Sequence, residues 1–358
     1  VVYQVRDYSH FQSEFVRDVV VSYFRLLQNR DSVFNAYSDY ESRLNATEYL
    51  LARSVDRENP LDVKQAEQAE LSAKNRYIDS VARYRNAVDD FKIRLGIPLS
   101  TDLQLDKTEL DDLRKVGLIP LELPPDQAVA IALDRRLPLL NEIDRFDDAK
   151  RRILVAADAL EGEVTLISNA TFLSDEPLNF LDFHFSDLQA NVAIQIDLPV
   201  NKKQERNAYR TTLIRFEEEI RSLSLTVDRL YQNVERFHRQ LEQFTLNYEI
   251  QQAAVEQARL RVEGARLRLA AGTAIFRDLE EAQDALIEAQ NAVTTALVNH
   301  LEVRLDYLVE LGILETDAPS FWLASQVLPS PKDMPASNAA RNSILRGDGV
   351  VPPIELFP

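Results

Sequence analysis

A seven-residue repeat of apolar side chains constrains the fold of this chain more than any other feature. Its steps alternate between three and four residues, which places its members along one side of an α-helix, and only Gln251 among them is polar. The repeat comprises Leu213, Phe216, Ile220, Leu223, Val227, Leu230, Val234, Phe237, Leu241, Phe244, Tyr248, Gln251, Val255, Ala258, Val262, Ala265 and Leu269. No Gly or Pro occurs between Asn201 and Glu263. The sequence therefore predicts a helix of about 70 residues, on the order of 100 Å long, in a left-handed supercoil.

A second long helical stretch opens the chain. Residues 1–59 contain neither Gly nor Pro. Their predicted seam is Tyr23, Leu26, Val33, Tyr37, Tyr40, Leu44 and Leu51, with Arg30 and Thr47 as polar breaks. Asn59-Pro60 interrupts the helix, because the residue before Pro disfavours helical backbone and Pro suits a first turn. We expect the next helix to run from about Leu61 to Leu95 and to end at Gly96.

Two runs in the middle of the chain alternate with the period of two that is typical of a β-strand. In each run one face is apolar and the other is rich in Gln, Asn and Thr. The apolar positions are Val164, Leu166, Ala170 and Phe172 in the first run, and Leu188, Ala190, Val192, Ile194, Ile196 and Leu198 in the second. Each run is about as long as a tilted strand that crosses a bilayer, and its polar face suits a wet lumen. The alternative is a hairpin on a soluble core, but the long helices around it favour the membrane.

The two helical stretches also form an internal repeat with an offset of 216 residues, the distance from Gly96 to Gly312. Applied without gaps, this offset pairs Asp62 with Asp278, Ala66 with Ala282, Ala69 with Ala285, Ala73 with Ala289, Asn75 with Asn291, Asp90 with Asp306, and Leu95 with Leu311. Each copy is predicted to be a long helix, a tight break and a shorter helix with an alanine stripe.

Composition excludes several classes of function. The formal charge of −17 makes the chain a poor nucleic-acid binder, and a water-filled passage lined by it would favour cations. The sequence has no cysteine and no apolar run of about 18 residues, so we expect neither thiol chemistry nor a transmembrane helix. His10, His184, His238 and His300 lack metal-ligand spacing, and no phosphate loop or nucleophile elbow is present. The sequence thus predicts no enzyme activity, no cofactor and no metal site.

Four segments together resemble the TolC family of outer-membrane efflux proteins. AGTAIFRDLEEAQDALIEAQNAV (271–293) and DRENPLDVKQAEQAELSAKNRY (56–77) resemble the two turns of the family. LPPDQAVAIALDRRLPLL (123–140) is similar to the segment that leads into its second repeat, and VAIQIDLPV (192–200) to its final strand. The resemblance extends from about Val16 to Leu314. It implies a mainly α fold in which long antiparallel coiled-coil helices form a trimeric α-barrel. A transmembrane β-hairpin would contribute to a shared outer-membrane β-barrel.

The resemblance assigns a place to each part of the chain. It implies a first helix pair at 1–96, an irregular equatorial segment at 97–137 and a helix leading to the membrane at 138–161. The membrane hairpin follows at 162–199, the second helix pair at 200–312 and a Pro-rich tail at 313–358. Because Val1 begins within a helical pattern and three copies would supply only six strands, we expect that an N-terminal part with its own strand pair is missing.

The two turns become the periplasmic tips under this resemblance. The implied tip residues are Asn59, Pro60, Asp62, Gly272, Thr273, Asp278 and Glu281. Asp278 and Glu281 match the acidic ring at the aperture, and Asp62 matches a tip Asp that helps to hold the closed state. The alternative is that these carboxylates only stabilise helix N-termini through the macrodipole. Ala274 stands where a gating Arg can occur, and the first turn has no Gly, so its tip geometry is expected to differ.

The resemblance implies a passive export duct of a tripartite efflux pump or a type I secretion system. Its partners would be two further copies of the chain, a periplasmic adaptor, an inner-membrane transporter and outer-membrane lipid, with no nucleic acid. It would lie in the outer membrane of a Gram-negative-type bacterium, with most of the chain in the periplasm. The alternatives are a periplasmic coiled-coil adaptor, whose lipoyl-like and β-barrel domains are not evident, and a scaffold without a pore. Nothing in the sequence identifies the cargo.

Overall fold

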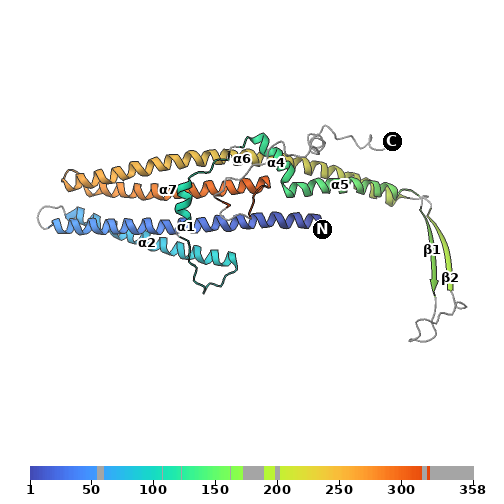
Figure 1. Ribbon diagram of the computed structural model, residues 1–358, viewed down its shortest axis with the longest axis horizontal. Coiled ribbons are helices and arrows are strands. Elements are labelled where there is room, and N and C mark those ends of the chain that lie inside the picture. The colour runs from blue at the N-terminus through green and yellow to red at the C-terminus, as the bar shows by residue number, and fades with distance from the viewer. Residues whose placement is uncertain are drawn as a thin grey trace, which may run out of the picture. The chain divides into compact units, whose positions relative to one another are not determined.

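The computed structural model describes residues 1–54, 60–106, 108–121, 123–161, 163–171, 189–197, 202–316 and 321–322. Its elements are α1 (Val2–Ser54), α2 (Pro60–Leu95), α3 (Glu109–Val116), α4 (Pro125–Arg135), α5 (Leu137–Asp158), β1 (Glu163–Thr171), β2 (Gln189–Asp197), α6 (Lys203–Ala270) and α7 (Phe276–Leu311) (Figure 1). The described chain is thus mainly helical with one β-hairpin, as the sequence predicted. It divides into two compact units, one of 1–140 and 228–358 and the other of 141–227.

The long heptad seam of α6 is confirmed. Every one of its positions from Leu213 to Leu269 is buried or half-buried, and residues between the seam positions are mostly exposed. In the first unit the seam faces α7, where the ring of Phe237 stacks on that of Tyr307 with centroids 5.8 Å apart. In the second unit α5 packs on the first part of α6, and the rings of Phe146 and Phe216 stack at 5.4 Å.

The internal repeat is confirmed to the residue. α2 and α7 each contain 36 residues, and both their first and their last residues differ by the predicted offset. Both helices end in the same cap, in which the glycine has a φ of 68°. At Gly96 the amides of residues 96 and 97 donate to the carbonyls of Ile93 and Lys92, and at Gly312 the equivalent bonds reach Val309 and Leu308.

The helices of the first unit follow the order α2, α1, α7, α6. α1 packs against both α2 and α7, and α6 reaches α7 through the Phe237–Tyr307 stack. The ion pairs Arg17–Asp306 and Arg43–Asp284 show that α1 and α7 are antiparallel, because the α7 number falls as the α1 number rises. Within this unit, α1 and α7 are therefore the inner helices, and α2 and α6 are the outer ones.

The predicted seam of α1 is wrong in part. Tyr37 and Leu51 were assigned to it but are 48% and 44% exposed. The buried line instead includes Asp39 and Arg43, at 5% and 0% exposure. A prediction based on apolar residues alone misses these positions, because charged side chains can be buried when they form ion pairs with each other.

The segment at 97–137, which was predicted to be irregular, contains two helices, α3 and α4. The helix α3 buries Leu110 and Leu113. Arg114 of α3 donates to Asp31 Oδ2 of α1 at 2.6 Å and to Thr294 Oγ1 of α7 at 2.8 Å. These bonds fasten α3 across the two inner helices.

Beyond α7, the structure also describes Trp322. Its ring lies edge-on to that of Phe24 at 6.3 Å, and its carbonyl accepts a hydrogen bond from Arg304 at 2.9 Å. Residues 323–358 of the predicted Pro-rich tail lie outside the described residues.

Candidate functional site

The two strands pair antiparallel in a register that aligns their apolar positions. Val164 lies opposite Ile196, and Leu166 lies opposite Ile194. On the other face Thr165 pairs with Gln195, Asn169 with Asn191, and Thr171 with Gln189. Ser168 on the apolar face and Ile167 on the polar face are the misfits, and they lie opposite Val192 and Ala193. The hairpin therefore has one apolar and one polar face, as its alternation predicted.

Within the described part of the chain, the apolar face of the hairpin is exposed. Its large side chains are 60–69% exposed: Val164, Leu166, Val192, Ile194 and Ile196. Ala170 and Ala190 on the same face are exposed as well. The predicted positions Phe172, Leu188 and Leu198 lie outside the described residues. A continuous apolar surface of this kind marks a place that another molecule or a lipid phase covers.

The second predicted turn, between α6 and α7, is closed by a glycine cap. Gly272 adopts a φ of 73°, a left-handed conformation in which a side chain is unfavourable. Its amide donates to Leu269, and Thr273 donates to the Arg268 carbonyl through both its amide, at 2.9 Å, and its hydroxyl, at 3.1 Å. Gly272 and Thr273 are exposed at the surface of the turn.

Two of the three predicted acidic positions lie in the first turns of helices, and Glu281 lies one turn further along α7. Asp278 stands in the first turn of α7, and Asp62 stands in the first turn of α2. Asp278 and Glu281 are exposed, whereas Asp62 is half-buried. Glu281 lies 3.6 Å from Arg261 of α6. This placement fits the macrodipole alternative as well as an acidic ring, which needs carboxylates from more than one chain.

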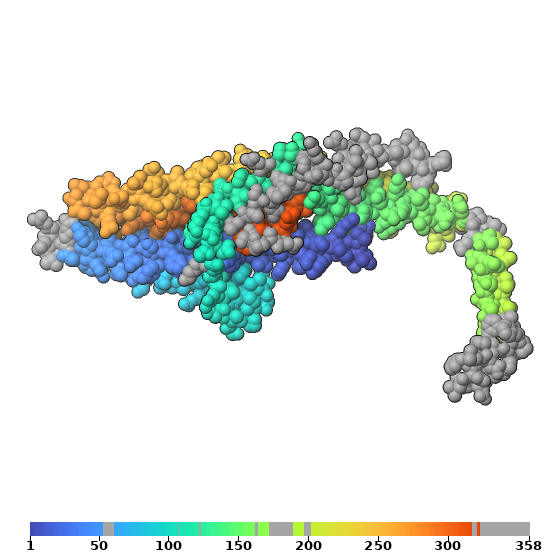
Figure 2. Space-filling view, in the orientation of Figure 1, coloured from blue at the N-terminus to red at the C-terminus, as the bar shows by residue number. Residues whose placement is uncertain are grey.

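The first predicted turn is described only at its edges. Asn59 lies outside the described residues, and Pro60 is the first residue of α2. The ends of α1 and α6 and the starts of α2 and α7 nevertheless share one apolar cluster, and Figure 2 shows the orange end of α6 beside blue α1. The cluster comprises Leu50, Val63, Ala66, Ala69, Ala265, Phe276, Leu279 and Ala282. The described helix ends next to both predicted turns are therefore packed together.

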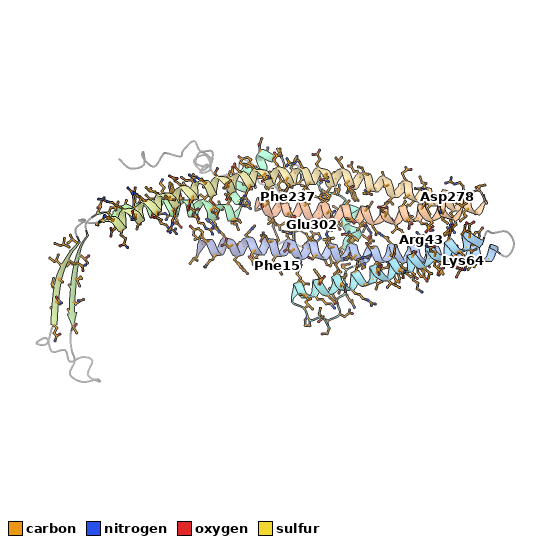
Figure 3. The ribbon with its side chains drawn as sticks, turned by 180° about the vertical axis from the view of Figure 1, so that it is seen from behind. Phe15, Arg43, Lys64, Phe237, Asp278 and Glu302 are labelled. Carbon is orange, nitrogen blue, oxygen red and sulfur yellow. The ribbon has the colours of Figure 1, made fainter. Side chains whose placement is uncertain are left out.

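An ion network lies next to this apolar cluster. The fully buried Arg43 of α1 donates to Asp39 Oδ1 at 2.8 Å and to Asp284 Oδ1 of α7 at 2.7 Å. Arg76 of α2 donates to the other Asp39 oxygen at 2.9 Å, and Glu280 lies 3.8 Å from Arg43. Figure 3 shows Arg43 near the same end of the helices as Lys64 and Asp278. The network joins α1, α2 and α7.

Sequence reasoning missed this network and the polar seam that contains it. Between α1 and α7, five of the contacts are polar pairs: Arg17–Asp306, Arg25–Glu302, Gln28–Thr295, Asn35–Asn291 and Arg43–Asp284. The sequence does contain a hint of the network. Asp39 and Arg43 are four residues apart on one predicted helix, and Glu280 and Asp284 are four residues apart on another, so each pair lies on one helix face. The seam of α6 is apolar, whereas the contact between α1 and α7 adds these polar pairs to the apolar cluster at the ends of the helices.

Among the described residues, no group of three or more His, Asp or Glu side chains is arranged to hold a metal ion. His300 is buried and belongs to no such group among the described residues. Its burial lowers its pKa to about 4, and the positive charge of the nearby Arg304 contributes to this shift. None of the helices that the structure describes combines the length and apolar character needed to cross a membrane.

Comparison with known proteins identifies the fold. No protein-family model matches the chain, and no curated protein matches it. Solved structures do match. The outer-membrane channel OprN superposes with a TM-score of 0.72 at 17% identity, covering 87% of this chain and 68% of that chain. The outer membrane protein VceC of Vibrio cholerae gives 0.69 at 14%, covering 87% and 74%.

A third match is the outer membrane channel CmeC of Campylobacter jejuni, with a TM-score of 0.71 at 15% identity, covering 89% of this chain and 67% of that chain. Each of these matches covers most of the present chain, and all are distant in sequence. They show the fold, and they agree with the resemblance that the sequence motifs carry.

Proposed function

We propose that this chain, which has the fold of TolC-like outer-membrane channels, is one protomer of a passive export duct. The observation that carries the proposal is the two-faced hairpin, with five large apolar side chains at least 60% exposed on one face and paired polar residues on the other. In a barrel wall the apolar face would contact lipid and the polar face would line a wet lumen. The solved structures with this fold include outer-membrane channels.

The hairpin needs neighbours in order to be stable. A lone two-stranded hairpin is marginal in water, and in a bilayer both of its edges would leave backbone groups unbonded. Closing the sheet with strands from other copies removes these edges. A membrane barrel shared between protomers therefore satisfies both the exposed apolar face and the exposed edges.

The two outer helices of the first unit each carry an exposed apolar stripe. On the outer helix α6, Leu246, Leu260 and Leu267 are separated by multiples of seven residues and are 54–65% exposed. On the outer helix α2, Leu71 and Ile78 repeat the same spacing at 60% and 53% exposure. Because these surfaces differ, contact of α6 with α2 of the next copy would be head-to-tail, and such contacts close into a ring when the rotation between copies returns to its start. We take three copies from the family resemblance.

The ends of the helices would form the periplasmic aperture. Exposed Asp278 and Glu281 from three copies would concentrate negative charge at a narrow opening, and such a ring favours cations. The packed end that holds both turns is the surface we assign to the periplasmic adaptor, through which the duct would meet an inner-membrane transporter. The transported compound and the choice between drug efflux and type I secretion are left open by this assignment.

Membrane extraction tests this proposal against its rivals. The full-length protein should remain in the outer-membrane fraction after washing with high salt and with alkaline carbonate, and detergent should release it. A periplasmic adaptor without a lipid anchor or a coiled-coil scaffold would be released by either wash. An adaptor held by lipid would need detergent but would form no conducting pore, so current recordings on the extracted protein separate that case.

A further inference from the structure

A carboxylate of α7 lies in an unusual environment where α1, α6 and α7 meet. Asp306 is three-quarters buried, and its Oδ1 atom is shielded from solvent. Arg17 of α1 places its Nε 3.1 Å from this oxygen. The two atoms are close enough for an ion pair, but they are not aligned for a hydrogen bond. The carboxylate is therefore largely buried, and its ion pair with Arg17 only partly offsets the free-energy cost of removing its charge from water.

The other charged groups around Asp306 do not offset the rest of this desolvation cost. Arg17 is shared, because its Nη1 also lies 2.8 Å from Asp18 Oδ1 on α1. Glu302, one turn earlier on α7, adds a negative charge and is itself bonded to Arg25 at 2.5 Å. Arg236 of α6 is a further cation that acts on Asp306. On α2, Arg94 lies 3.9 Å from Asp18 and so competes for that partner.

The balance of these effects raises the pKa of Asp306 to about 6. Burial is the largest cause, Glu302 and Asp18 act in the same direction, and Arg17 and Arg236 oppose them. An unfolded aspartate titrates near 3.8. The packed state thus binds this proton more tightly than the unfolded chain does.

We propose that the joint of α1, α6 and α7 around Asp306 is an acid-responsive device, which tightens when this carboxyl group takes up a proton. The sign follows from linkage. A group whose pKa is raised in the folded state contributes stability that is complete below about pH 4 and is lost as the pH rises through about 6. Mild acid therefore favours the packed joint, and neutral medium leaves a charged, under-compensated carboxylate within it. The tightening does not depend on the duct function.

The internal repeat supplies a matched control. Asp90 of α2 is the counterpart of Asp306 at the offset of 216 residues, and it occupies the equivalent position of a helix of the same length. Asp90, unlike Asp306, is exposed. Asp90→Asn changes the same charge at the same helical position, but on an exposed side chain of α2 rather than on a buried one of α7.

The test compares pH profiles of reversible denaturant unfolding for the full-length protein in detergent. The ratio of the folding equilibrium constants of wild type and Asp306→Asn should rise about tenfold as the pH falls from about 7.5 to about 5. This ratio isolates Asp306, because other groups such as His300 titrate equally in both proteins. The corresponding ratio for Asp90→Asn should stay flat.

Arg17→Gln provides a second readout that a merely structural residue would not change. Removing the nearest cation should raise the pKa of Asp306 further, so the midpoint of the pH-dependent step should move to higher pH. If Asp306→Asn fails to fold, this midpoint decides the question. Parallel pH profiles for wild type and Asp306→Asn, or an unchanged midpoint in Arg17→Gln, would overturn the proposal.

Discussion

The buried guanidinium of Arg43 on α1 lies 2.7 Å from the carboxylate of Asp284 on α7. Arg43 also pairs with Asp39 of α1, and Arg76 of α2 joins the network through the same Asp39. This network is therefore a buried polar link between the hairpin of α1 and α2 and the hairpin of α6 and α7.

Replacing Arg43 with Met should destabilise the chain by about 3 kcal/mol. The substitution leaves Asp39, whose side chain is 2% exposed, with only Arg76 as a partner. Because Arg76 still neutralises Asp39, we expect a loss of stability at the low end of the range that is typical for breaking a buried ion pair. Equilibrium unfolding in denaturant measures the change.

The matched control is Arg261→Gln, which removes the Arg261–Glu281 pair between α6 and α7. Those side chains are 55% and 60% exposed, and an exposed pair contributes about 1 kcal/mol or less. Equal losses in the two variants would contradict the importance of burial at Arg43.

The two helix-capping glycines should respond differently to alanine. Both have a φ of 68°, so each substitution costs roughly 1 kcal/mol of backbone strain. A Cβ at Gly312 would also lie 2.6 Å from the Arg135 carbonyl oxygen, whereas a Cβ at Gly96 meets nothing within 4 Å. Gly312→Ala should therefore lower the melting temperature clearly more than Gly96→Ala. Similar melting temperatures would mean that the backbone at Arg135 yields easily.

Charge placed on the two faces of the hairpin should separate a membrane strand from a soluble one. Ile194 and Gln195 are adjacent, exposed and on opposite faces of β2. In a membrane barrel Ile194→Arg should cost roughly 2–4 kcal/mol near the bilayer centre, and Gln195→Arg should cost little. Outer-membrane yield of each variant measures this difference. A soluble hairpin would tolerate both arginines equally.

Acid should weaken the packing around His300. Burial lowers its pKa to about 4 from an ordinary 6.5. A depressed pKa means that the stability contributed by the neutral imidazole is present above about pH 6.5 and is lost as the pH falls toward 4. His300→Gln should remove roughly 2–3 kcal/mol of pH dependence across this window, as shown by unfolding at several pH values. An unchanged profile would contradict the shift.

The features that could be predicted from sequence are those that rest on local, repeated chemistry. The seam from Leu213 to Leu269 was readable because apolar residues occupy it almost without interruption, and α6 buries that same seam. The caps at Gly96 and Gly312 were readable because glycine is favoured where a helix ends in left-handed backbone. The alternation from Val164 and from Ala190 likewise fixed the two faces of the hairpin.

What escaped prediction depends on partners that are distant in the sequence. Arg43 and Asp39 are charged, so a pattern of apolar residues assigns them to the surface. They are nevertheless buried, because Asp284 of α7 and Arg76 of α2 form ion pairs with them. The raised pKa of Asp306 similarly results from a joint of three helices. The short helix α3 was missed because its order depends on the bonds of Arg114 to α1 and α7.

The ionic current through single molecules tests the central claim most directly. Full-length, detergent-purified protein in a planar bilayer with a KCl gradient should give a steady, cation-selective conductance. Replacing both Asp278 and Glu281 with Ala should reduce that selectivity, because these exposed carboxylates would line the aperture. A tightly shut aperture is distinguished by Asp62→Ala, which is expected to loosen it. The absence of conductance from both folded wild type and Asp62→Ala would contradict the account of this chain as a duct.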